Sequence, residues 1–236
     1  MAGEGAPLGG RTALVTGASR GIGLAVAAAL AAAGARLTLL ARDERRLERV
    51  AAELNGRAIA CDVANAADVE RVLATVAEAP DILVNNAGLF ELARVEDTKA
   101  GAFESALAVN LVAPFLLLRG LLPAMRERGR GDVVSIGSIA DHTTFPENGA
   151  YAASKHGLRA LHDVVRAELR GSGVRTTLIS PGPVDTPLWD PIDPDTRAGF
   201  TPRTRMLPAD AVAAAVLYAV TQPPEVDVEL VRLSHS

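Results

Sequence analysis

The sequence predicts an α/β fold in which a doubly wound parallel sheet is covered by helices on both faces. Short apolar runs alternate with segments of helical periodicity from Arg11 to Leu233, and this alternation is typical of repeated βαβ units. A chain of 236 residues also suits one large core better than two small ones. We therefore expect residues 1–236 to form a single domain.

The apolar runs place seven strands, at about 12–16, 36–41, 58–61, 82–85, 132–137, 175–180 and 227–232. Helical periodicity places six helices between them, at about 21–33, 45–54, 67–77, 102–128, 150–170 and 209–221. One long irregular stretch remains, at about 183–207, and it contains the only tryptophan. Long loops inside compact domains commonly act as lids, so we expect a substrate lid there.

Composition excludes several classes of protein. A formal charge of −4 with scattered basic residues lacks the basic face that nucleic-acid binding needs. The single Cys61 can form no internal disulfide, and its apolar setting favours a buried structural thiol. Residues 1–7 lack the basic and apolar regions of a signal peptide, and no uninterrupted apolar run reaches the roughly 18 residues of a membrane span. We expect a soluble, cytoplasmic protein.

A glycine-rich turn follows the first strand and leads into the first helix, in the sequence Thr16-Gly-Ala-Ser-Arg-Gly-Ile-Gly23. Gly17 permits a tight turn, Gly21 lets the backbone approach a pyrophosphate, and Gly23 allows close packing of helix and strand. The helix N-terminus offers free N–H groups and a positive dipole end to phosphates. The turn therefore predicts a dinucleotide site in a Rossmann fold.

A second motif, Tyr151-Ala-Ala-Ser-Lys155, places one of only two tyrosines four residues before one of only two lysines. Residues four apart share one face of a helix, so both side chains can act on one substrate. An ammonium near a phenol favours the phenolate. Lys155 is thus predicted to tune Tyr151 as a proton donor and acceptor.

With these two motifs the chain resembles the short-chain dehydrogenase/reductase family over essentially its whole length. Further family motifs follow in order: Cys61-Asp62-Val63, Asn85-Asn86-Ala87-Gly88, Asn110, Ser138 and Pro181-Gly182-Pro183-Val184-Asp185-Thr186. The resemblance implies a seven-stranded sheet in the order 3-2-1-4-5-6-7. It also implies cofactor contacts from Gly17, Ser19, Arg20, Gly21, Ile22, Gly23, Arg42, Asp62, Val63, Asn86, Ala87, Gly88, Tyr151, Lys155, Pro181, Gly182, Val184 and Thr186.

The family's catalytic residues correspond here to Asn110, Ser138, Tyr151 and Lys155. By resemblance, Ser138 hydrogen-bonds the substrate oxygen, and Lys155 also binds the nicotinamide ribose. Asn110 would hold a water that links Lys155 to solvent, although a buried packing hydrogen bond is the alternative for this side chain.

The end of the second strand bears on cofactor choice. NAD-preferring relatives carry an acidic residue where this chain has Ala41. Arg42 and Arg20 could instead flank a 2′-phosphate with charge-assisted hydrogen bonds, which favours NADP(H) over NAD(H). Asp43 could serve as a ribose ligand, but we interpret it as the N-cap of the next helix.

The sequence therefore predicts an NADP(H)-dependent oxidoreductase that interconverts a ketone or aldehyde with its alcohol. One alternative is a 3-oxoacyl-thioester reductase, for which Arg203 and Arg205 could meet a phosphopantetheine phosphate or simply form a solvated lid face. A non-enzymatic alternative is an NADP(H)-binding sensor or scaffold. The resemblance also implies a homotetramer or homodimer built on the helices at 102–128 and 150–170.

The substrate pocket is expected to include Phe90, His142, Phe145, Trp189 and Phe200, whose aromatic members suggest an apolar substrate. No metal site is expected, because neither His142 nor His156 has a second ligand at metal-binding spacing. His156 is interpreted as structural, and Tyr218 as a core or interface residue.

Overall fold

Seven parallel strands form one sheet in the order β3-β2-β1-β4-β5-β6-β7, which confirms the predicted fold class and strand order. The structure, a computed structural model, describes residues 5–76 and 78–236. The strands are β1 (Thr12–Thr16), β2 (Arg36–Ala41), β3 (Arg57–Ala60), β4 (Ile82–Asn85), β5 (Gly131–Ile136), β6 (Val174–Pro181) and β7 (Leu230–Leu233). The order reverses between β1 and β4, where β1 lies between β2 and β4. Ligands of open α/β sheets bind at such a switch point.

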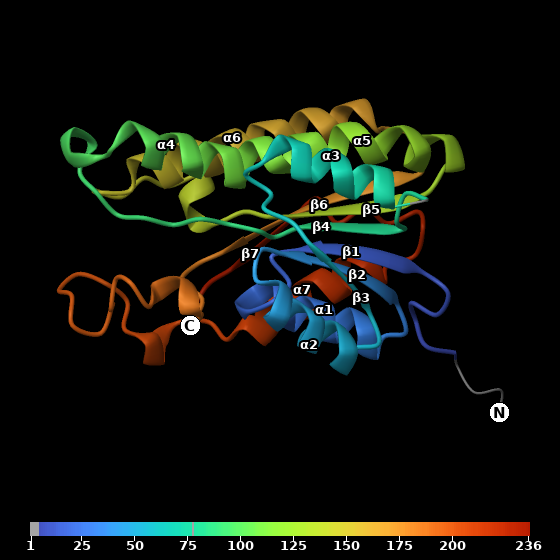
Figure 1. Ribbon diagram of the computed structural model, residues 1–236, viewed down its shortest axis with the longest axis horizontal. Helices are drawn as coiled ribbons and strands as arrows, with labels where there is room; N and C mark the ends of the chain where they lie inside the picture. Colours follow the sequence, from blue (N-terminus) through green and yellow to red (C-terminus); the bar gives the residue numbers. More distant parts are fainter. Residues whose placement is uncertain (1–4, 77) are drawn as a thin grey trace.

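Helices cover both faces of the sheet. They are α1 (Gly21–Ala32), α2 (Glu44–Glu53), α3 (Ala66–Thr75), α4 (Ala100–Leu107), α5 (Ala113–Arg128), α6 (Gly149–Glu168) and α7 (Ala209–Val220). Figure 1 shows α3, α4, α5 and α6 on one face, and α1, α2 and α7 on the other. Every strand connection is therefore a crossover, as a parallel sheet requires.

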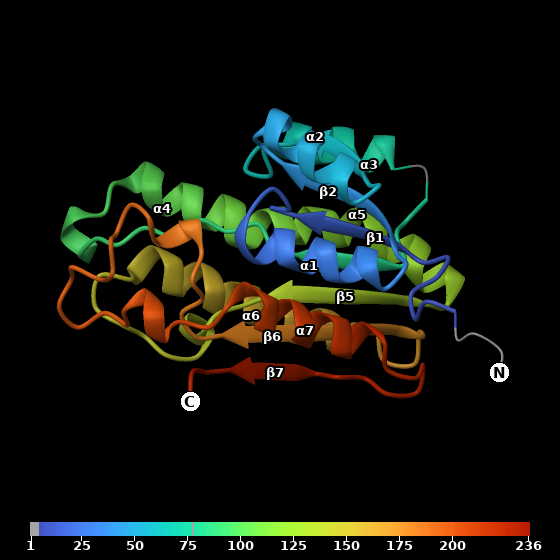
Figure 2. The same cartoon turned by 90° about the horizontal axis from the view of Figure 1, so that it is seen from below.

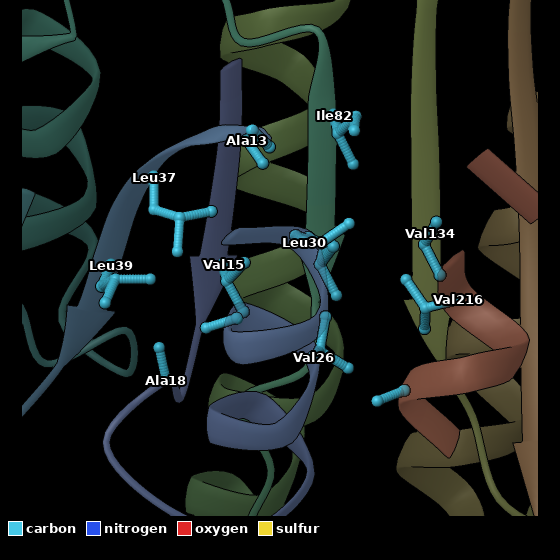
Figure 3. Packing of buried hydrophobic residues seen from close by; sticks show 14 of the residues in the cluster. Ala13, Val15, Ala18, Val26, Leu30, Leu37, Leu39, Ile82, Val134 and Val216 are labelled. Carbon is cyan, nitrogen blue, oxygen red and sulfur yellow. The ribbon is translucent and has the colours of Figure 1, made fainter. Parts of the chain in front are cut away.

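Two clusters of buried aliphatic side chains hold the layers together. In Figure 3, Val26 and Leu30 of α1 point toward Val15 and Ile82 on the sheet, and this cluster extends to Val216 of α7. The second cluster joins the opposite sheet face to α3, α5 and α6. Neither cluster, in the part of the chain that the structure describes, contains an aromatic side chain. Both clusters are therefore aliphatic apart from Cys61 and Met125 in the second one.

Apart from shifts of one or two residues at other boundaries, three expected elements differ from those observed. The helix expected at 102–128 is divided by a π-helical turn at Ala108–Val112 into α4 and α5. The last strand begins at Leu230 rather than at residue 227. The third helix was expected to reach Ala77, which lies outside the described residues, and the described part of it ends at Thr75.

The continuous helical segment Ala100–Arg128 is long and apolar enough, by length and composition alone, to cross a membrane. This match tolerates charged residues within the segment, so it does not contradict the absence of an uninterrupted apolar run of that length. Here the segment lies against the sheet and buries Leu117, Leu121 and Met125 in the second cluster.

The segment expected as a lid leaves the end of β6 and contains two short 3₁₀ turns, Pro187–Trp189 and Arg203–Arg205. Its two ends are joined by a β-bridge between Val184 and Leu207. Both views place this segment, drawn in orange, at the same end of the molecule as α4 (Figure 1 and Figure 2).

Candidate active site

A cleft of about 1280 Å³ opens at the carboxyl ends of the strands. Its walls come from the turn after β1, the loops after β2 to β6, the start of α6 and the segment 183–207 that was expected as a lid. Every residue expected to contact the cofactor lines it, from Gly17 in the first turn to Thr186 in the lid. One continuous cleft therefore connects the glycine-rich turn to the tyrosine motif.

The glycine-rich turn needs glycine for steric reasons. Gly17 has a φ of 67°, and a Cβ there would lie 2.9 Å from the Ala87 Cα atom. A Cβ on Gly23 would lie 2.3 Å from the carbonyl oxygen of Gly17. The turn and the start of α1 thus pack against the loop after β4 too closely for any side chain.

The N-terminus of α1 suits an anionic group. Arg20 occupies the N-cap position without a capping side-chain hydrogen bond, and the first turn contains no acidic residue. The first N–H groups of the helix are therefore available to a ligand, and the helix dipole favours negative charge there. Arg20, Gly21 and Ile22 all line the cleft, so these residues fit a pyrophosphate.

The end of the cleft formed by the glycine-rich turn and the loop after β2 is basic. Exposed Arg20 and Arg42 line it, together with Arg46. Asp43 also lines the cleft, but its carboxylate accepts a hydrogen bond of 3.0 Å from the Arg46 backbone N–H. This confirms Asp43 as the N-cap of α2. The Asp43 carboxylate is thereby partly occupied, whereas two guanidinium groups remain exposed.

Tyr151 and Lys155 project from the first turns of α6 toward the end of β5. The Lys155 ammonium nitrogen lies 5.6 Å from the centroid of the Tyr151 ring. Nζ of Lys155 donates a hydrogen bond of 2.8 Å to the carbonyl oxygen of Ile136, and the residue is only 4% exposed. Ser138 lines the same part of the cleft. The structure thus brings three of the four expected catalytic side chains together.

Burial shifts the pKa values of this pair in opposite directions. Burial raises the pKa of Tyr151 to about 12; a hydrogen bond with Ser138 opposes the shift, and the Asp141 charge adds to it. Burial lowers the pKa of Lys155 to about 8, and the Asp141 charge opposes that shift. Tyr151 is therefore protonated at neutral pH while Lys155 remains largely charged.

A buried carboxylate next to Ser138 was not expected from the sequence. Asp141 is 1% exposed, and its Oδ2 accepts hydrogen bonds from the Ser138 backbone N–H (3.2 Å) and from the Ser180 hydroxyl. Its Oδ1 meets Nδ1 of His142 at 2.7 Å and Nη1 of Arg159 at 3.4 Å. The available signal was the spacing Ser-x-x-Asp, which forms a capping box at Ser138.

Asn110 lies apart from the cleft wall, inside the π-helical turn, and is 1% exposed. Its Oδ1 accepts a hydrogen bond of 2.8 Å from the Leu89 N–H. Its Nδ2 donates to the Leu89 carbonyl and to Ser154 Oγ, each at 2.9 Å. The side chain thus makes the buried packing hydrogen bonds of the alternative expectation and joins the loop after β4 to α6, while the predicted water between Asn110 and Lys155 stays a prediction.

Four of the five expected pocket residues line the cleft, namely Phe90, Phe145, Trp189 and Phe200. The Phe90 ring packs edge-to-face on Tyr151 at 4.8 Å and on Trp189 at 5.1 Å between centroids. His142 is the exception, because its ring binds Asp141 and it does not line the cleft. His142 directly follows the short 3₁₀ turn after Ser138. In that turn the side chain of Asp141, one position earlier, is the one directed inward.

The two arginines considered for phosphate binding, and the possibility of a metal site, can also be compared with the structure. Arg203 is held by the carboxylates of Asp185 (2.8 Å) and Asp190 (2.6 Å), and neither Arg203 nor Arg205 lines the cleft. Within residues 5–76 and 78–236, no group of three or more His, Cys, Asp or Glu side chains could hold a metal ion.

Comparison with known proteins gives consistent matches. The family model described as short chain dehydrogenase matches residues 11–197. The chain is 39% identical over 223 residues to D-threitol dehydrogenase from Mycolicibacterium smegmatis, covering 89% of this chain and 86% of that protein. It is also 33% identical to an uncharacterized oxidoreductase from Staphylococcus haemolyticus, covering 96% and 97% of the two chains.

Solved structures match over nearly the whole chain. A metagenomic short-chain oxidoreductase in complex with NADP has a TM-score of 0.81 and 34% identity, covering 98% of this chain and 99% of its own. A putative betaketoacyl-ACP reductase has a TM-score of 0.85 and 32% identity, covering 96% and 97%. With its sheet order, glycine-rich turn and tyrosine motif in agreement, the chain belongs to the short-chain dehydrogenase/reductase family of oxidoreductases.

Proposed function

We propose that the protein is an NADP(H)-dependent oxidoreductase that interconverts a ketone or aldehyde with its alcohol. The observation that carries this proposal is the position of Tyr151, Lys155 and Ser138 at one end of a cleft whose other end is an uncapped helix N-terminus with two arginines. Residues 183–207 act as the lid over the substrate end.

In the direction of reduction, the Tyr151 hydroxyl gives its proton to the substrate oxygen. Ser138 donates a hydrogen bond to the same oxygen as negative charge develops on it. Lys155, 5.6 Å from the Tyr151 ring, stabilises the phenolate that remains. Because the pKa of Tyr151 is raised to about 12, the tyrosine holds its proton at neutral pH, which suits reduction.

The cofactor proposal rests on charge. A nicotinamide dinucleotide, when bound, supplies or accepts the hydride. Gly21, Ile22 and Gly23 would bind its pyrophosphate through their N–H groups, while Arg20 and Arg42 would bind a 2′-phosphate. Solved relatives in complex with NADP support this choice.

The relatives suggest two other substrates. Similarity to D-threitol dehydrogenase suggests a sugar alcohol as the substrate. Similarity to a putative betaketoacyl-ACP reductase suggests a 3-oxoacyl thioester. The thioester is less well supported by the lid, because Asp185 and Asp190 already neutralise Arg203.

We also propose a homotetramer or homodimer built on α5 and α6, and a cytoplasmic location. Exposed Phe115 on α5 and Val164 on α6 give these helices an apolar outer surface, and exposed Phe103 on α4 and Val112 in the π-helical turn extend it. Buried Cys61 is the only cysteine, which fits a reducing compartment.

Replacing Tyr151 with Phe tests the catalytic proposal. The variant lacks only the hydroxyl, so turnover should fall by at least about 100-fold, the usual contribution of general acid–base catalysis. NADPH affinity, measured by calorimetry, should stay within a few-fold. Turnover retained at the wild-type rate would contradict the role of Tyr151, and NADPH binding without turnover on any carbonyl compound would favour a sensor.

A further inference from the structure

Resting on the proposed function, we propose that the substrate carries an aryl or similarly bulky apolar group beside the reacting carbon, and that this group binds against Phe90, Trp189 and Phe200. The cleft would thus select an aryl ketone or its alcohol over a small polyhydroxylated compound.

The distribution of aromatic residues is the first observation. The chain has eight of them: five Phe, two Tyr and one Trp. Five line the cleft, namely Phe90, Phe145, Tyr151, Trp189 and Phe200. The other three, Phe103, Phe115 and Tyr218, are exposed on helices. Aromatic side chains usually contribute strongly to cores, whereas both described core clusters here have none. The aromatic side chains are therefore concentrated in the cleft.

The geometry of the rings is the second observation. Phe90 contacts the Tyr151 ring, Trp189 contacts Phe90, and Phe200 follows Trp189 at 6.4 Å between centroids. All three pairs are edge-to-face, with interplanar angles of 66° to 79°. The rings form a continuous apolar wall that begins at the proposed proton donor. Each is only partly buried, so a bound apolar group would remove further aromatic surface from water.

The polar groups around this wall are the third observation, because several already have partners, the buried Oδ1 of Asn148 being an exception among the described residues. The indole nitrogen of Trp189 donates to the Val184 carbonyl at 3.0 Å. Arg197 pairs with Glu147 and stacks on Phe200, with its guanidinium carbon 4.9 Å from the ring centroid. The Ser105 hydroxyl donates to the Gly101 carbonyl at 2.7 Å. A substrate with several hydroxyl groups would lose water here and find few replacements.

Steady-state reduction by NADPH gives the direct test, with acetophenone, 2-butanone and erythrulose as substrates. Burial of a phenyl group favours kcat/KM for acetophenone over 2-butanone by at least about tenfold, and erythrulose should be the poorest substrate. Equal values for acetophenone and 2-butanone, or preference for erythrulose, would overturn the inference while leaving the proposed oxidoreductase activity intact.

Phe200→Ala removes the far end of the wall without touching the Tyr151 ring. We expect it to lower the ratio of kcat/KM for acetophenone to that for 2-butanone by about fivefold or more. Phe103→Ala is the matched control, since Phe103 is exposed on α4 and does not line the cleft. An unchanged ratio in Phe200→Ala, or an equal fall in both variants, would contradict the role of the wall.

A binding measurement separates this inference from the proposed function. Trp189 is the only tryptophan, so its fluorescence reports on the wall directly. Acetophenone and erythrulose are each titrated into wild-type protein with NADP⁺, a combination that permits no reduction. Tighter binding of acetophenone supports the inference even if no carbonyl compound is turned over, whereas equal or tighter binding of erythrulose overturns it.

Discussion

Asp141 contributes to the electrostatic surroundings of the proposed catalytic tyrosine, after burial and the hydrogen bond with Ser138. Its buried carboxylate is bonded to the Ser138 N–H and to Ser180, and it faces His142 and Arg159 on its other oxygen. Its negative charge raises the pKa values of both Tyr151 and Lys155. A residue outside the tyrosine motif therefore affects the proton that the reaction moves.

Asp141→Asn should shift the pH dependence of alcohol oxidation, which requires the phenolate form of Tyr151. Removing the negative charge, and leaving the charges of Lys155 and Arg159, lowers the pKa of Tyr151. The rising limb of the kcat/KM profile should therefore move to lower pH. Asp163→Asn is the control, because Asp163 also pairs with Arg159 but is exposed. An unmoved limb in Asp141→Asn, with its melting temperature preserved, would refute this electrostatic effect.

Arg42 should distinguish the two cofactors. In Arg42→Asp, a carboxylate replaces a group proposed to bind the 2′-phosphate, so the dissociation constant for NADPH should rise by at least about tenfold, the loss expected for a charge-assisted pair. The constant for NADH should change by less than about threefold. Calorimetric titration of both cofactors measures this, and equal losses would argue against the 2′-phosphate contact.

At the scale of single residues, the sequence predicted the residues that belong to motifs but not all of their surroundings. Gly17, Tyr151 and Lys155 lie in the cleft because strand ends and a helix face determine their positions. His142 was expected in the pocket but does not line the cleft, and Asp141 was missed. Both lie in a three-residue turn, where the direction of each side chain depends on tertiary packing rather than on periodicity.

Among the elements, the turn before β6 is the most sterically restricted. Gly173 has a φ of 77°, and a Cβ there would lie 2.0 Å from the carbonyl oxygen of Gly129 at the end of α5. Gly171, two residues earlier, has a φ of 75° but nothing within 4 Å of such a Cβ. A substitution at either glycine therefore causes backbone strain, whereas only a substitution at Gly173 also causes steric overlap.

Gly171→Ala should cost about 1–2 kcal/mol of folding stability, the penalty for a left-handed alanine. Gly173→Ala should cost clearly more, because the Gly129 carbonyl must also move. Thermal denaturation monitored by circular dichroism checks both, with about 2–4 °C expected per kcal/mol in a chain of this length. Equal melting temperatures for the two variants would show that the contact with Gly129 is relieved at no cost.

The expected elements agree with the observed ones except where local geometry departs from regular periodicity. The π-helical turn at Ala108–Val112 has the same apolar composition as its neighbours, so nothing in the sequence marks it. It orients Asn110 toward Leu89 and Ser154, which are tertiary contacts. Strand β7 pairs only with β6, and an edge strand has no second neighbour that fixes its start.

At the scale of the whole molecule, the apolar surface of α5 and α6 is the feature that the monomer leaves unexplained. Phe115 is 46% exposed and Val164 is 54% exposed, and both helices lie on the same face of the sheet (Figure 1). Phe115→Asp should convert the proposed oligomer to a smaller species in light scattering after size-exclusion chromatography. Ala52→Asp, on exposed α2, should not. A monomeric wild-type protein would contradict the proposed assembly.

The fold as a whole was predictable because alternating apolar runs and helical segments permit few arrangements. A parallel sheet with right-handed crossovers, a switch point and a glycine-rich first turn determines which strand ends meet. The identity of the substrate was less predictable. It depends on how the segment 183–207 brings Trp189 and Phe200 beside Phe90, which lies about 100 residues earlier in the sequence.

The most direct test of the central claim is transfer of the hydride itself. NADPH carrying deuterium on the transferred position of C4 is incubated with acetophenone and the protein, and the 1-phenylethanol formed is analysed by mass spectrometry. The account predicts one deuterium on the carbinol carbon with wild-type protein, and no product above background with Tyr151→Phe. Unlabelled alcohol from the wild-type protein, or equal labelled product from the variant, would contradict it.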